Sequence, residues 1–123
     1  MINKITNLNN LESTITLIIS SLENSKAKDI VVIDLLNKTS FADLMIIASG
    51  TSKRHISSIS DNIKNELKNY KIKVNIEGLS SCDWVLIDCK SIIVHIFQPD
   101  TRLYYNLEKM WSFNIDPSKT KKI

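Results

Sequence analysis

The fold is decided by the stretch Asp83–Phe97, DWVLIDCKSIIVHIF, which reads as two strands joined by a tight turn. Both arms are rich in Val, Ile and aromatic residues, which favour strands, and the interruption falls at polar residues. A two-residue turn at Cys89-Lys90 predicts three cross-strand pairs: Asp88 with Ser91, Leu86 with Ile93, and Trp84 with His95. The register stays open, because Cys-Lys is not among the favoured hairpin dipeptides.

Side chains alternate between the two faces of a strand, so this pairing sorts the hairpin cleanly. One face is entirely apolar and is predicted to be core: Val85, Ile87, Ile92, Val94 and Ile96. The other face mixes a Trp and a His with aliphatic groups, which is typical of a surface that meets a partner. Its members are Trp84, Leu86, Asp88, Ser91, Ile93, His95 and Phe97.

The composition fits one small domain. The chain has 123 residues and is 43% hydrophobic, which suffices for one core and is too short for two. We predict a single domain at 1–114 and a basic, flexible tail at 115–123. The tail carries three lysines and one aspartate, so most of the net charge of +3 lies there. A strongly basic nucleic-acid-binding face is therefore not indicated for the body.

Cys82 and Cys89 are the only cysteines, and they form neither a CxxC motif nor a cluster with His at metal-ligand spacing. We expect free thiols in a reducing compartment. The sequence contains no apolar run of membrane-spanning length and no secretion signal. These features predict a soluble intracellular protein without a metal or another cofactor.

Hydrophobic periodicity predicts the order helix, strand, strand, helix, strand, strand, strand, helix. This order indicates an α/β (α+β) fold, with a single mixed five-stranded sheet flanked by helices. The short link between the first two strands predicts an antiparallel pair, and the helix before the third strand predicts a right-handed parallel crossover. The first predicted helix is 7–24, the second is capped by Thr51 or Ser52 and runs to about 68, and the third is capped by Asp100 or Thr101 and runs to about 111. The predicted strands are 30–36, 44–48, 73–76 and the two arms of the hairpin.

The last predicted helix carries an apolar stripe at Leu103, Leu107, Met110 and Trp111. Arg102 and Tyr105 then point away from the stripe, and exposed Arg and Tyr side chains are typical interface anchors. For one of Tyr104 and Tyr105 we expect the ring to pack at the core edge with its hydroxyl in water.

Three other features are candidates for chemistry: a strand-to-helix junction, a set of aspartates and His95. Residues 50–55, GTSKRH, lie at a strand-to-helix junction, where backbone N–H groups could hold a phosphate. A Gly followed by a Ser/Thr cap also starts many ordinary helices, and we favour that structural role.

Asp34, Asp43 and Asp88 could converge on a metal ion, yet no two have the spacing of a two-metal site. His95 has no nucleophile near it in sequence, so a recognition role is favoured over a catalytic dyad.

Seven motifs in this order resemble the ribosomal silencing factor family (RsfS, also called Iojap-like) over about residues 7–112. They are DIVVID (29–34), SFAD (40–43), IASGTSKRH (47–55), EG (77–78), DWVLID (83–88), VHIF (94–97) and RLYYNLEKMW (102–111). The resemblance implies a cytoplasmic bacterial protein that binds the large ribosomal subunit through ribosomal protein L-fourteen, blocks association with the small subunit and represses translation. It also implies frequent homodimers when free, no established enzymatic activity, and a nucleotidyltransferase-like core without the catalytic Asp-x-Asp.

Residue by residue, the resemblance assigns Asp83 and Trp84 to the family's sheet motif and Tyr104 or Tyr105 to its aromatic pair. In place of the family's glycine and acid, the hairpin turn has Cys89-Lys90-Ser91. We predict no catalytic and no metal-binding residue. The predicted surface for the ribosomal protein comprises Asp83, Trp84, His95, Phe97, Arg102, Tyr104 and Tyr105. The alternatives are a nucleotide- or metal-dependent nucleotidyltransferase-like enzyme and an RNA-binding module, whose ribosomal RNA contacts we expect to be at most peripheral.

Overall fold

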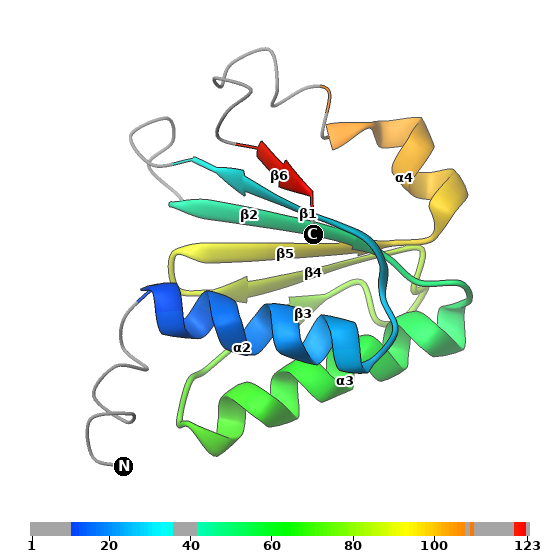
Figure 1. Ribbon diagram of the computed structural model, residues 1–123. Helices are drawn as coiled ribbons and strands as arrows, with labels where there is room; N and C mark the ends of the chain where they lie inside the picture. Colours follow the sequence, from blue (N-terminus) through cyan, green and yellow to red (C-terminus); the bar gives the residue numbers. More distant parts are fainter. Residues whose placement is uncertain (1–10, 36–41, 108, 110–119, 123) are drawn as a thin grey trace.

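A computed structural model describes residues 11–35, 42–107, 109 and 120–122. Its centre is one six-stranded sheet with the strand order β3-β4-β5-β2-β1-β6. Helices α2 and α3 lie side by side against one face of this sheet, and α4 lies toward the other (Figure 1). The elements are α2 (Leu11–Asn24), β1 (Lys28–Asp34), β2 (Leu44–Ser49), α3 (Lys53–Asn69), β3 (Asn75–Glu77), β4 (Trp84–Cys89), β5 (Ile92–Phe97), α4 (Pro99–Tyr105) and β6 (Thr120–Lys122).

The predicted fold class is confirmed: a single mixed sheet is flanked by helices, and all five predicted strands are present. The sheet also has a strand that we did not predict, because β6 pairs antiparallel with β1. The predicted flexible tail is therefore wrong for residues 120–122. A strand at the edge of a sheet leaves N–H and C=O groups unpaired, and the backbone of β6 satisfies those of β1. Residues 115–119 and 123 of the predicted tail lie outside the described residues.

The helix predictions hold in their centres and differ at their ends. Helix α2 is described from Leu11 onward, and residues 7–10 lie outside the described part. Of the two predicted caps of α3, Ser52 is the one observed, and its Oγ accepts a hydrogen bond from the His55 N–H at 3.0 Å. Helix α4 begins at Pro99, with Gln98 at the N-cap position, so the predicted cap at Asp100 or Thr101 is wrong. Asn106 adopts a left-handed conformation (φ 48°) and interrupts the predicted helix after Tyr105, and Leu107 and Lys109 are again helical. Met110 and Trp111 lie outside the described residues.

The predicted apolar stripe of the last helix is wrong at its first position. Leu103 is 78% exposed, and α4 has no buried residue. The turn at Asn106 redirects the chain, so that Leu107 rather than Leu103 packs against the sheet.

The connections between strands correct one prediction and confirm another. Strands β1 and β2 are antiparallel, as predicted. The crossover after β2 does not bring β3 beside it; β2 pairs in parallel with β5, and β3 pairs with β4 at the edge of the sheet. The chain thus runs from β2 through α3 to the far edge and returns by two hairpins. Strand β3 still runs parallel to β2, with β4 and β5 between them.

The central hairpin has a different register from the predicted one. Its turn is Lys90-Ser91, and Lys90 adopts φ 54°. Trp84 therefore pairs with Phe97, and Leu86 pairs with His95. The shift amounts to two residues, and an even shift leaves every side chain on its predicted face. All five residues of the predicted core face are at most 1% exposed.

Two hydrophobic clusters lie on opposite sides of the sheet. The larger one fills the space between the sheet and the helices α2 and α3. The smaller one covers the other face around Met45, Ile47 and Phe97. Every residue of β2 is buried, which agrees with its continuous apolar sequence. Among the described helices, none combines the length and apolar character that a membrane span requires.

We expect Gly78→Ala to destabilise the fold. Gly78 adopts φ 95°, and a Cβ atom there would overlap the carbonyl oxygen of Trp84. Backbone strain and steric overlap together should lower the free energy of unfolding by about 2–4 kcal/mol in urea denaturation. Ser80→Ala changes an exposed residue of the same loop and should stay within about 0.5 kcal/mol of the wild type. A Gly78→Ala protein as stable as the Ser80→Ala protein would contradict this account.

Candidate functional site

Trp84, the first residue of β4, lies in a cluster of aromatic rings on the sheet face opposite α2 and α3. Its ring stacks on its cross-strand partner Phe97, with a centroid distance of 5.0 Å and an interplanar angle of 27°. Tyr105 contacts the indole from α4 at 4.8 Å, tilted by 47°. Aromatic pairs in such geometries contribute about 0.5–1.5 kcal/mol each beyond burial. These contacts restrict the position of an indole that remains partly accessible to solvent.

His95 holds the polar end of the same indole. The Trp84 Nε1–H donates a hydrogen bond of 2.9 Å to the His95 Nδ1. Desolvation by burial lowers the pKa of His95 from 6.5 to about 4. The imidazole is therefore neutral at physiological pH, and its unprotonated Nδ1 can accept the bond. The predicted cross-strand pair of Trp84 with His95 is wrong, because the two residues lie diagonally rather than directly opposite, but their side chains are in contact through this hydrogen bond.

Helix α4 adds the exposed part of the cluster. Tyr104 is 82% exposed, and its ring meets that of Tyr105 edge-on at 5.1 Å. Tyr105 is 46% exposed and packs on Trp84, so it is the tyrosine that we expected at the core edge. We call Trp84, Tyr104 and Tyr105 the aromatic face. Together with Ser81, Asp83, Asp100 and Thr101 they line an open cavity of about 540 Å³.

Arg102 connects α4 to the sheet. Its Nη1 donates a hydrogen bond of 2.7 Å to Ser49 Oγ at the end of β2. Ser49 is only 3% exposed, so the anchor point lies within the protein. A helix of seven residues is too short to be stable alone, and tertiary contacts of this kind hold it in place. Arg102 therefore positions the two tyrosines.

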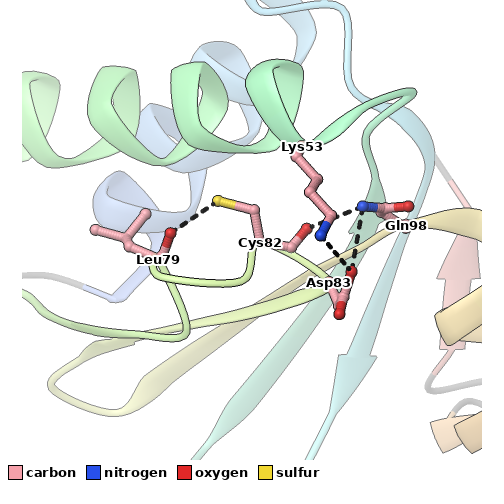
Figure 2. A network of polar contacts seen from close by, with 5 residues as sticks. All are labelled: Lys53, Leu79, Cys82, Asp83 and Gln98. Atoms are coloured by element: carbon pink, nitrogen blue, oxygen red, sulfur yellow. Dashed lines mark hydrogen bonds and ion pairs between the residues drawn. The ribbon is translucent and has the colours of Figure 1, made fainter.

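Asp83 connects three elements beside the aromatic face. Lys53 Nζ, at the start of α3, lies 3.7 Å from Asp83 Oδ1, and Gln98 Nε2 donates to the same oxygen at 3.3 Å. Figure 2 shows both side chains reaching toward Asp83 from different elements. The Gln98 N–H also donates to the Asp83 carbonyl oxygen at 3.0 Å. Asp83 thus fixes the start of β4 against the end of β5 and the start of α3.

The structure separates the predicted surface into exposed and supporting residues. Asp83, Tyr104 and Tyr105 are exposed, and Trp84 and Arg102 are partly exposed. His95 and Phe97 are 5% and 1% exposed, so they do not present a surface to a partner in this structure. They were predicted as contact residues because they share the strand face with Trp84. That face is covered at these two positions, and they support Trp84 from below.

The other candidates have structural roles. In the 50–55 junction, the Thr51 N–H donates to His55 Nδ1 at 2.9 Å, and His55 Nε2 lies 2.7 Å from the Ser25 carbonyl oxygen. These contacts use groups that a phosphate would need, and they tie the junction to the loop after α2. Among the described residues, no three of His, Cys, Asp or Glu are grouped closely enough to hold a metal ion. The three candidate aspartates thus form no metal site there. Cys82 and Cys89 are free and buried, and burial raises the pKa of the Cys89 thiol.

The sequence did not place Ser49 or Asp100 at this site, and Asp100 was predicted only as a possible helix cap. Ser49 ends a continuous apolar strand, where a serine carries no signal of a tertiary partner 53 residues away. Asp100 is an ordinary first-turn acid in a helix, and only the packing of α4 places it beside Trp84.

The fold and this face define a small mixed α/β domain with a supported aromatic cluster on one face of its sheet. The family model described as "Ribosomal silencing factor during starvation" matches residues 8–123. The chain therefore belongs to the RsfS family, and the resemblance carried by its motifs is confirmed.

Curated relatives and a solved structure agree with this assignment. The ribosomal silencing factor RsfS of Zymomonas mobilis is 42% identical over 103 residues, covering 83% of this chain and 77% of the relative. RsfS of Haemophilus influenzae is 40% identical over 96 residues, covering 77% of this chain and 94% of the relative. The crystal structure of a Chromobacterium violaceum protein superposes with a TM-score of 0.81 at 33% identity, covering 84% of this chain and 87% of that one.

We expect the protein to lose stability as the pH falls from 6.5 to 4, in part through His95. Its folded pKa of about 4 lies below its ordinary value of 6.5, so the unfolded chain binds the proton more readily in this window. The resulting contribution is fully present above pH 6.5 and lost at pH 4, and it amounts to about 3 kcal/mol.

The measurement is urea denaturation at several pH values for the wild type and for His95→Asn. The amide oxygen of Asn can accept the indole hydrogen bond and does not titrate. Subtracting the two pH profiles removes the contribution of the carboxyl groups. If the free energy of unfolding changed with pH in the same way in both proteins, His95 would contribute nothing to the pH dependence. That result would contradict a neutral, desolvated His95 with a lowered pKa.

Proposed function

We propose that this protein binds the large ribosomal subunit through ribosomal protein L-fourteen, sterically blocks association with the small subunit and so represses translation. Membership of the RsfS family supports the ribosome as the target, and relatives from two bacteria carry the name ribosomal silencing factor. The site of action is then the bacterial cytoplasm, where the ribosomes are, rather than an organelle. The role requires no catalysis and no cofactor.

The observation that carries this proposal is the supported, partly exposed indole of Trp84. A hydrogen bond to His95 and ring contacts with Phe97 and Tyr105 restrict its position before any partner arrives. A preorganised aromatic side chain loses little conformational freedom on binding, and such residues dominate the energetics of many interfaces. Tyr104, exposed beside it, extends the area that a partner can cover.

The residues around the aromatic face favour a protein, rather than a small substrate, as its binding partner. The cavity is open, and carboxyl groups of Asp83 and Asp100 lie beside the rings. An apolar centre with a polar, charged rim is the usual arrangement of a protein–protein interface. A side chain of the ribosomal protein can enter the cavity while its backbone remains at the rim.

The mechanism is steric. A domain of this length has a radius of gyration of about 14 Å. A copy docked by the aromatic face therefore keeps most of its volume outside the partner surface. If that surface borders the contact between the subunits, the small subunit cannot close onto the large one. The sheet and its two clusters make the bound body rigid, as a steric block requires.

We further propose that the free protein forms a homodimer through the same face. Leu103 and Tyr104 are both about four-fifths exposed, and such neighbouring apolar groups favour association in water. Light scattering after gel filtration should give twice the chain mass for the wild type and a shift toward the monomer for Tyr104→Ala. A wild type that stays monomeric at high micromolar concentration would contradict this part of the proposal.

We expect Trp84→Ala and Tyr104→Ala each to weaken binding to the large subunit by tenfold or more, which corresponds to about 1.4 kcal/mol or more. The measurement is co-migration with purified large subunits in a sucrose gradient, together with the fraction of subunits that join when small subunits are added. The wild type should lower that fraction, and the two variants should restore it.

The two alanine variants differ in their expected effect on the fold, so each serves as a control for the other. Trp84 packs on Phe97, so its removal can disturb the sheet, whereas Tyr104 is 82% exposed and its removal should leave the circular dichroism spectrum unchanged. Tyr104→Phe keeps the ring and should retain most of the binding. Wild-type co-migration of both alanine variants would exclude the aromatic face as the docking surface.

A further inference from the structure

A second surface lies at the other end of the molecule, where α3 ends. Between residues 62 and 75 every exposed side chain is a lysine or an asparagine, and the one acid of this segment, Glu66, is half-buried. We call its lysines the basic end: Lys64, Lys68, Lys71 and Lys73. Among the residues that the structure describes, none of the four forms an ion pair. The asparagines are Asn65, Asn69 and Asn75, together with Asn62, whose amide already donates a hydrogen bond of 2.8 Å to Ser25 Oγ.

The backbone holds these lysines in a defined arrangement. Lys64 and Lys68 are four residues apart and therefore lie on the same side of α3. The helix ends with hydrogen bonds from Lys71 N–H to the Lys68 carbonyl oxygen and from Ile72 N–H to the Leu67 carbonyl oxygen, both 2.9 Å long. Ile72 is 6% exposed, so a buried anchor separates Lys71 from Lys73. The four charges thus gather at one end of the helix.

Helix stability accounts for only part of this arrangement. A cation in the last turn, such as Lys68, complements the helix dipole. Lys71 and Lys73 follow the helix, and Lys71 has φ 60°, a conformation in which glycine is the favoured residue. The same motif ends α2, where Lys26 has φ 61°. Lys26 provides a matched control, because α2 ends near the beginning of α3, where Ser25 contacts His55.

We propose that the basic end binds the phosphodiester backbone of RNA. Lysines neutralise phosphates and release counterions, and asparagine amides donate hydrogen bonds to phosphate and ribose oxygens. A membrane surface would call for exposed apolar groups to enter the lipid, and a protein partner for aromatic anchors. The exposed side chains of this segment include neither. Because the chain belongs to a family of ribosomal factors, RNA is the polyanion that we expect it to meet.

The basic end can act together with the aromatic face. Helix α3 has 17 residues and spans about 25 Å. It begins where Lys53 meets Asp83, beside the aromatic face, and runs to the opposite end of the molecule (Figure 1). The two surfaces therefore do not compete for the same space. A protein contact at one end and a phosphate contact at the other would fix the orientation of the bound domain.

The test measures fluorescence anisotropy of a labelled 20-base-pair RNA duplex titrated with the full chain at several salt concentrations. We expect weak binding at low salt that falls steeply as salt is added. The variant K64Q/K68Q/K71Q/K73Q should bind at least tenfold more weakly at low salt. The dependence of log K on log salt should also become shallower, by about 0.7–0.9 for each phosphate that the variant no longer neutralises.

The control variant K26Q/K28Q/R54Q/K109Q removes the same number of charges from exposed positions outside the basic end. It should bind the duplex within about twofold of the wild type. Equal loss in both variants would show that net charge alone attracts RNA, and no loss in the first variant would show that the basic end does not bind it. Either result overturns the proposal. Binding of poly-glutamate as tight as that of RNA would assign the surface to acidic proteins instead.

Two single variants distinguish the effect of losing a charge on RNA binding from the effect of changing the backbone conformation on stability. Lys71→Gly and Lys26→Gly both relieve a left-handed backbone and should raise the urea midpoint or leave it unchanged. Only Lys71→Gly should weaken RNA binding, by about two- to threefold, and equal effects of the two changes would contradict the proposal. Tyr104→Ala, which removes an exposed ring of the aromatic face, should bind the RNA duplex as tightly as the wild type, so the RNA-binding proposal can fail without the docking proposal failing, and the reverse.

Discussion

The structure depends on the burial of β5 on both of its faces. This strand pairs in parallel with β2 and antiparallel with β4, so it cannot shift without breaking both ladders. Val94 and Ile96 enter the core below α2 and α3, while His95 and Phe97 lie under the opposite face. Burial keeps His95 neutral, and a buried neutral imidazole nitrogen needs a hydrogen-bond donor. The indole of Trp84 provides that donor, and the position of the aromatic face follows from it.

Contacts at the ends of the strands that neighbour β5 also determine the position of the aromatic face. Asp83 and Gln98 close the open end of the β4–β5 hairpin, and Lys53 joins α3 to this point. Helix α4 leaves the end of β5 and returns over the sheet, where Arg102 reaches Ser49 of β2. The beginning of β4 and the ends of β2 and β5 therefore meet beside the start of α3. Helix α3 carries the chain from this point to the basic end, so one rigid element separates the two surfaces.

Turns in this chain are made with few glycines. Five described turn and loop residues other than glycine have a positive φ, as does Asp29 within β1, whereas the sequence has only two glycines. A non-glycine residue in the left-handed region costs about 1–2 kcal/mol. The cores on both sides of the sheet offset this cost through the burial of large aliphatic side chains. Gly78 remains where no side chain fits, because the carbonyl oxygen of Trp84 occupies the space.

The sequence by itself determined the fold class, the order of the predicted elements and the two faces of the central hairpin. These properties follow from periodicity, and the face assignment survived an incorrect register because the shift was even. It also determined the family, through motifs spread along the chain. Only the tertiary structure decided that His95 and Phe97 lie below the surface, that β2 neighbours β5, and that residues 120–122 join the sheet. Local pattern carries no information on which distant segments cover a residue, and such contacts as that of Arg102 with Ser49 exist only after the chain has folded.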